Sequence, residues 1–168
     1  MSQCLISEEL CDSLCFQISH ERYNSGFYMY IAGVLQNKGL DNLAQHFIDQ
    51  IDEENDHAKL IYDFLVDMNA IISIKPIDEV QLNINSINDI ATNYLQREQA
   101  TTKDLEDIKQ LAIQESNGVA EEFLRQMIDR QRNELKEAST FVDNAELCVD
   151  WRDTKKWNDS IDIEEEDD

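Results

Sequence analysis

Two sets of metal-binding side-chain types recur in this chain at a single offset. Each set has one Glu and, 33 residues later, the first of two polar residues spaced i, i+3. Every member of the second set lies 77 residues after its counterpart in the first, which gives Glu21, Glu54 and His57, then Glu98, Gln131 and Glu134. A helical hairpin with this pattern can supply half of a two-metal carboxylate site. The repeat therefore predicts two hairpins and one dinuclear metal site.

Four segments with helical periodicity carry these residues at inward-facing positions. Apolar residues alternate at spacings of four and three over about residues 7–38, 41–69, 86–112 and 119–147. Asp41 is the predicted N-cap of the second segment, and Ser86 and Asp89 form a capping-box pattern at the start of the third. The six polar residues interrupt the apolar seams at similar distances from the turns at Gly39 and Gly118, so they should meet at one level of the bundle.

The composition predicts one all-α domain, with only four Gly and one Pro among 168 residues. Residues 70–85 contain Pro76 and lack helical periodicity, and at about 3.3 Å per residue they can run the length of the bundle. We therefore expect residues 1–150 to form a four-helix bundle with one long crossover. For residues 151–168 we expect a short fifth helix that ends in an acidic tail from about Glu164.

Inward-facing carboxylates need a partner, because an isolated buried charge costs several kcal/mol. Arg97, Arg130 and Arg132 adjoin seam positions in sequence and so point away from them, which leaves metal ions such as iron as the neutralising charge.

The formal charge of −22 disfavours nucleic acids and anionic membranes as partners. No apolar run is long enough to span a bilayer. The start of the chain lacks signal-peptide features, and the four cysteines include no C-x-x-C pair, so we expect a cytoplasmic protein.

Over roughly residues 6–148 the chain resembles the bacterial-type non-haem ferritins of the ferritin superfamily. The similarity lies in segments that look like the ferroxidase-centre segments of helices A, B, C and D, namely His20–Tyr23, Asp52–His57, Arg97–Gln99 and Gln131–Glu134. The resemblance implies a ferritin-like bundle with its crossover between helices B and C. It also implies a ferroxidase that oxidises Fe(II) with O2 or H2O2 and stores a ferric oxyhydroxide mineral inside a 24-subunit shell.

The resemblance further implies roles for individual residues, with two irons per subunit. One iron would be held by Glu21, Glu54 and His57, with Glu54 bridging to the second. Glu98 and Glu134 would hold the second iron, with Gln131 close by. Tyr28 matches a tyrosine near the centre that donates an electron or hydrogen-bonds a ligand; a packed core tyrosine is the alternative.

Two departures from related patterns change the expected ligands. Bacterioferritins carry a second Glu-x-x-His where this chain has Gln131-x-x-Glu134, and Asn55 replaces their haem-ligating Met, so we expect no haem. Bacterial ferritins can also carry a third iron site. Glu53 matches that site, whereas Arg130 and Asn133 occupy positions that are usually acidic, so the chain departs from the pattern of the third site at two positions.

The sequence is also compatible with two other functions. A non-storage di-iron oxidase or peroxidase of the same superfamily would show low iron capacity. A metal-free helical scaffold would use the polar seam to set helix register and would bind no iron.

Overall fold

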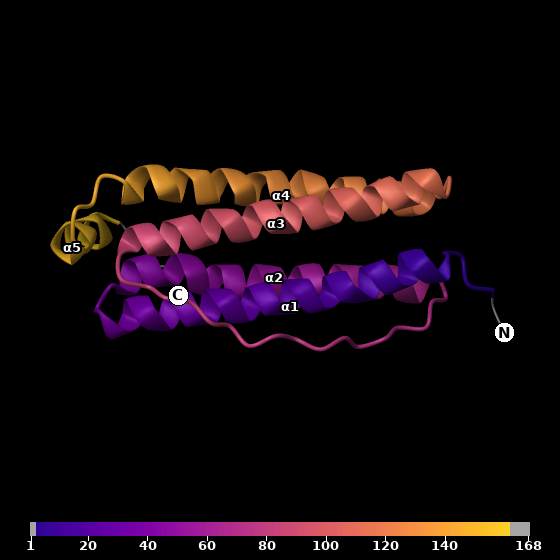
Figure 1. The fold of residues 1–168 in the computed structure, drawn as a ribbon, viewed down its shortest axis with the longest axis horizontal. Helices are drawn as coiled ribbons and strands as arrows, with labels where there is room; N and C mark the ends of the chain where they lie inside the picture. Colours follow the sequence, from indigo (N-terminus) through magenta and orange to yellow (C-terminus); the bar gives the residue numbers. More distant parts are fainter. Residues whose placement is uncertain (1–2, 162–168) are drawn as a thin grey trace, which may run out of the picture.

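Five α-helices make up the computed structural model, which describes residues 3–161 and contains no strand in that range. They are α1 (Glu8–Asn37), α2 (Asp41–Asp67), α3 (Ile87–Gln114), α4 (Gly118–Ala145) and α5 (Trp151–Ser160). The hairpin of α1 and α2 lies beside the hairpin of α3 and α4, with α5 at one end (Figure 1). The predicted all-α bundle and its four long helices are confirmed. Within the described range, no helix combines the length and apolar character needed to cross a membrane.

Side-chain caps explain where several helices begin. The Ser7 hydroxyl accepts from the backbone N–H of Leu10 at the start of α1, and the predicted capping box of Ser86 and Asp89 is confirmed at the start of α3. The prediction of Asp41 as an N-cap is wrong, because Asp41 is the first helical residue and Leu40 precedes it without a side-chain cap. The tight turn through Gly39, at φ 71°, directs Leu40 into the core instead.

The crossover between α2 and α3 runs as an extended segment along α1 (Figure 1). The Tyr30 hydroxyl donates to the Leu82 carbonyl oxygen at 3.1 Å. Val80 packs so closely that its Cγ2 would lie 3.6 Å from a Cβ added at Gly26. The crossover returns the chain to the opposite end of the bundle, which makes α3 parallel to α2.

Two apolar clusters fill the bundle on either side of a polar layer. The cluster nearer α5 includes Phe47, Tyr94 and Phe141, and the cluster at the other end includes Leu14 and Leu124. Burial of each such aliphatic or aromatic side chain contributes about 1.5–3 kcal/mol. The two apolar clusters therefore stabilise the fold. The polar layer between them is not needed for this packing and can hold functional residues.

The fifth helix is confirmed as a docked element. Asp150 caps it by accepting from the backbone N–H groups of Arg152 and Asp153. The Asn158 side-chain oxygen accepts from the backbone N–H of Leu43 at 3.0 Å, and the Trp157 ring lies 4.9 Å from that of Phe141. These contacts hold α5 against the start of α2. The expected acidic tail from about Glu164 lies outside the described residues.

Candidate di-metal centre

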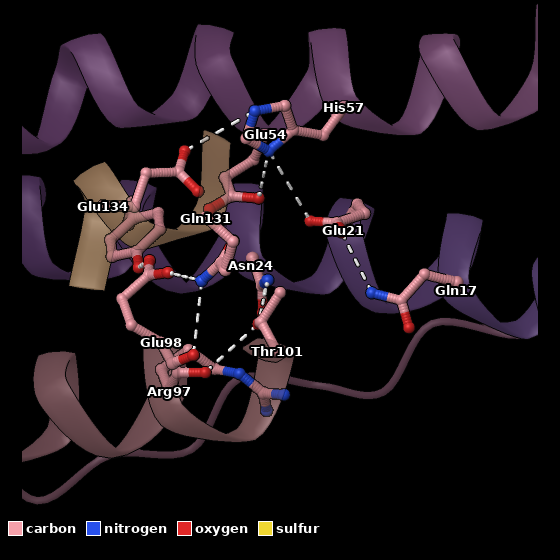
Figure 2. Close-up of polar contacts among 11 residues, drawn as sticks. Gln17, Glu21, Asn24, Glu54, His57, Arg97, Glu98, Thr101, Gln131 and Glu134 are labelled. Atoms are coloured by element: carbon pink, nitrogen blue, oxygen red, sulfur yellow. Dashed lines mark hydrogen bonds and ion pairs between the residues drawn. The ribbon is translucent and has the colours of Figure 1, made fainter. Parts of the chain in front are cut away.

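The six residues singled out by the repeat converge in the polar layer (Figure 2). They come from all four long helices: Glu21 from α1, Glu54 and His57 from α2, Glu98 from α3, and Gln131 and Glu134 from α4. All six are buried, and even His57, the most accessible of them, is only 9% exposed. The predicted meeting of the two half-sites at one level of the bundle is what the structure shows.

The His57 ring lies among three carboxylates. Its Nδ1 is 3.6 Å from Glu54 Oε2 and 4.0 Å from Glu21 Oε2, and its Nε2 is 3.6 Å from Glu134 Oε1. Ligand-type atoms of Glu21, Glu54 and His57 fall within 4.8 Å of one another, and so do those of Glu54, Glu98 and Glu134. Because the two groups share Glu54, the arrangement could hold two neighbouring cations with one common carboxylate.

Several carboxylate oxygens in this layer have no hydrogen-bond partner. They are Glu21 Oε2 and both oxygens of Glu54 and of Glu134. Among the residues described, His57 is the only base within 4 Å of these groups. A buried oxygen left unpaired costs about 1–3 kcal/mol. Hard carboxylate oxygens with one imidazole form a donor set that suits iron, and the unpaired oxygens fit such a metal.

Burial makes these carboxyl groups weak acids in the absence of a cation. It raises the pKa of Glu54 to about 8 and that of Glu134 to about 9. Burial, and then the negative charge of Glu54, raises the pKa of Glu21 well above its ordinary value. The metal-free cluster therefore holds protons at neutral pH, and a bound metal would displace them.

Hydrogen bonds orient Glu98 from two sides. The Tyr28 hydroxyl and the Gln131 amide both donate to its carboxylate, and the amide also reaches the Glu98 carbonyl oxygen at 3.2 Å. Burial raises the pKa of Glu98, and these two donors act in the opposite direction. Gln131 thus lies at the centre (Figure 2). The hydrogen bond from Tyr28 to Glu98 brings the Tyr28 hydroxyl to the centre as well. A role for Tyr28 in electron donation stays a prediction.

Sequence reasoning missed three supporting residues. The Gln17 amide donates to Glu21 Oε1 at 2.9 Å, and its position one turn before Glu21 was the available signal. The Asn24 amide donates to the Thr101 hydroxyl at 2.9 Å. Asn24 and Thr101 are 77 residues apart, the same offset as the ligand pairs, so the repeat itself could have identified them.

The residues bearing on a third iron site lie outside this buried layer. Glu53 is exposed on α2, and Arg130 and Asn133 are exposed on α4. Asn55, which stands where related proteins carry a haem ligand, is also exposed. A third iron site that uses Glu53 stays a prediction.

A four-helix bundle with one long crossover and buried carboxylates on every helix defines a class of helical proteins that bind metals in the bundle core. The family model for the ferritin-like domain matches residues 12–148. Because this match covers most of the chain, the protein belongs to the ferritin family.

Individual relatives agree with this assignment. The chain is 25% identical over 138 residues to a bacterial non-heme ferritin of Staphylococcus aureus, covering 82% of this chain and 83% of the relative. It is 26% identical over 139 residues to the bacterial non-heme ferritin of Staphylococcus haemolyticus, covering 83% and 84%. An open pore ferritin from Archaeoglobus fulgidus has the same fold, with a TM-score of 0.88 at 23% identity over 94% of this chain and 96% of that one.

Proposed function

We propose that this protein stores and detoxifies iron by oxidising Fe(II) to Fe(III) at a dinuclear ferroxidase centre. The observation that carries the proposal is the pair of overlapping ligand groups that share Glu54, whose oxygens lack protein partners. Dioxygen or hydrogen peroxide is the oxidant in this scheme. Two irons held side by side can each supply an electron, and hard carboxylates favour the Fe(III) product.

The proposed roles follow from the contacts of each residue. Glu21, Glu54 and His57 hold one iron as substrate, and Glu54, Glu98 and Glu134 hold the other. Gln17 and Gln131 orient carboxylates through their amide groups. Tyr28 stabilises the charged form of Glu98 by donating a hydrogen bond. The scheme includes no haem, because Asn55 offers no thioether ligand.

Storage requires an enclosed space, which we assign to a 24-subunit shell. The chain's membership of the ferritin family and the names of its relatives as non-heme ferritins support this assignment. Residues 1–150 would form the bundle unit and residues 151–168 its C-terminal extension. The four unpaired cysteines suit a reducing compartment, so we place the shell in the cytoplasm.

Aerobic iron loading tests the proposal. Fe(II) is added in increments to the purified protein, and the soluble, protein-bound iron per chain is measured together with the oxygen consumed. Loading on the order of a hundred irons per chain supports mineral storage, since the six-residue centre offers ligands for only a pair of metals. Saturation near two irons would replace storage by a non-storage oxidase or peroxidase. Purified protein that contains no iron and gains no thermal stability from added iron would favour a metal-free scaffold.

A further inference from the structure

Two cysteines share one face of α1 near the start of that helix. Cys11 and Cys15 lie one helical turn apart, so their side chains are neighbours. Cys15 is only 1% exposed, and Cys11 is partly buried in the same cluster. Burial, and then the adjoining Cys15 thiol, raises the pKa of Cys11 to about 11. Cys15 precedes Glu21 by six residues, about 9 Å along the helix axis, so this sheltered pair of thiols is separate from the di-metal centre.

The crossover meets both sulfur atoms with backbone polar groups. The backbone N–H of Ser73 donates to Cys15 Sγ at 3.4 Å, and Cys11 Sγ donates to the Ile71 carbonyl oxygen at 3.5 Å. An N–H group directed at sulfur favours the thiolate over the thiol, and such bonds also tune sulfur ligands of metals. The environment of Cys15 therefore suits a sulfur atom that carries negative charge.

Lys75 holds the crossover against α1 at this point. Its Nζ lies 2.5 Å from Asp12 Oδ1 and 4.6 Å from the centroid of the Phe16 ring. The crossover runs along α1 from this end of the bundle onward (Figure 1). The backbone groups that contact the two thiols are thus fixed by side-chain contacts on both sides.

The number of thiols available restricts the ligand. Cys148 belongs to the apolar cluster on the other side of the polar layer. Cys4 is exposed, and its thiol donates to the Ile6 carbonyl oxygen at 3.3 Å. Within residues 3–161, no cysteine belongs to a group of three or more ligand-type side chains. Structural zinc sites take four ligands and iron–sulfur clusters take four thiolates, so two thiols suit neither.

A disulfide between the two cysteines would be strained. Side chains four residues apart on a helix have Cβ atoms about 5–6 Å apart, whereas a disulfide needs Cβ atoms about 3.5–4.5 Å apart. A metal ion can span the wider gap, because each metal–sulfur bond adds about 2.3 Å. The helical spacing therefore favours a shared metal ion over a covalent bond.

We propose that Cys11 and Cys15 form a soft-metal site that takes one Cu(I) ion through two thiolates. Soft sulfur ligands select Cu(I), which is stable with only two of them. On binding, two S–H protons leave to solvent and two copper–sulfur bonds form, with no transfer of electrons. The Ser73 N–H stays directed at Cys15 Sγ. The site depends on sulfur rather than carboxylate ligands, so it does not rest on the proposed iron chemistry.

Two double variants with equal numbers of thiols test this site. Cys4→Ser/Cys148→Ser keeps the pair, and Cys11→Ser/Cys15→Ser keeps the other two cysteines. Each assembled, metal-free protein is reduced and titrated anaerobically with Cu(I) in competition with bicinchoninate, a coloured Cu(I) chelator. The variant that keeps the pair should bind one Cu(I) per chain. The other should bind at least about a hundredfold more weakly, since loss of groups that only orient metal ligands already costs 10–100-fold in affinity.

X-ray absorption at the copper edge identifies the ligands in Cys4→Ser/Cys148→Ser itself, so this readout does not depend on the folding of the other variant. A shell of two sulfur atoms supports the proposal. Equal Cu(I) affinity of the two double variants, no tight binding by the variant that keeps the pair, or a copper shell of nitrogen and oxygen would overturn it. Light scattering checks assembly, and Cys11→Ala/Cys15→Ala replaces the serine variant if a buried hydroxyl prevents that variant from assembling.

Discussion

A Glu54→Gln substitution should stabilise the metal-free protein at neutral pH and remove most of its response to metal. Burial raises the pKa of Glu54 to about 8, against an ordinary value of 4.5. At pH 7 this carboxyl group is therefore mostly protonated in the folded state and ionised in the unfolded chain. Glutamine keeps the shape and polarity of the neutral carboxyl group without this protonation cost.

The sign and size of this stability difference follow from the linkage between proton binding and folding. The folded state binds more protons than the unfolded chain between about pH 4.5 and pH 8, so the contribution of Glu54 is fully present below that window and is lost as the pH rises through it. At pH 7 the loss covers about 2.5 pH units at about 1.4 kcal/mol each, which amounts to about 3–4 kcal/mol. For a chain of this size, that corresponds to a difference in Tm on the order of 10 °C.

Thermal unfolding of metal-free protein, followed by circular dichroism at pH 4.5 and pH 7, measures this difference. The assembly size is checked by light scattering at each pH. Asp56→Asn, an exposed position on the same helix, is the matched control and should change Tm little at either pH. Two results would refute the reasoning. One is a difference in Tm between Glu54→Gln and the wild type that is the same at both pH values. The other is a variant that is less stable than the wild type at pH 7.

Adding metal should remove most of this stability difference between the wild type and the Glu54→Gln variant. Zn(II), which has no redox chemistry, should stabilise the wild type by about 2.7 kcal/mol at a concentration one hundred times its Kd. The Glu54→Gln variant should gain far less, because both ligand groups lose their shared carboxylate. Equal stabilisation of the two proteins by Zn(II) would show that Glu54 is not a ligand.

Three further substitutions probe the centre and its scaffold. Glu54→Ala combined with His57→Ala should slow Fe(II) oxidation greatly without unfolding the bundle, as measured by oxygen uptake and circular dichroism. Tyr28→Phe should destabilise the metal-free protein by about 1–3 kcal/mol in thermal unfolding, because buried Glu98 loses a donor. Ser86→Ala should cost about 1 kcal/mol in the same assay, because it removes one half of a capping box without touching the centre.

A specific result would contradict the prediction for each of these three variants. Unchanged oxidation kinetics in the double variant would rule out the assigned ligands. Tyr23→Phe is the control for Tyr28→Phe, because Tyr23 is only partly buried; equal effects of the two would show that the Tyr28 hydroxyl contributes nothing to Glu98. A Ser86→Ala variant with altered iron oxidation would indicate that the start of α3 influences the centre.

Helical periodicity was enough to predict the four long helices and the inward face of each one. The reason is local: side chains three and four residues apart share one face of a helix, whatever the helix packs against. Helix starts depend in addition on the residues that precede the helix. The capping box at Ser86 was predicted correctly, whereas Asp41 was misassigned because the buried Leu40 and the turn at Gly39 decide where α2 begins.

The residues of the C-terminal segment do not by themselves determine its helix. Its helix is short and polar, so intrinsic propensity supports it weakly. Docking of Trp157 on Phe141, and the bond from Leu43 to Asn158, stabilise it through partners far away in sequence. Such contacts cannot be read from local spacing.

By itself, the sequence determined the fold class, the six inward-facing polar residues and their common level in the bundle, because all of these follow from helix geometry and chain length. The tertiary structure alone decided that the two ligand groups share Glu54 and that Tyr28 and Gln131 both donate to Glu98. These features depend on distances between helices. Such distances are set by the packing of large side chains above and below the polar layer, and periodicity along one helix does not encode them.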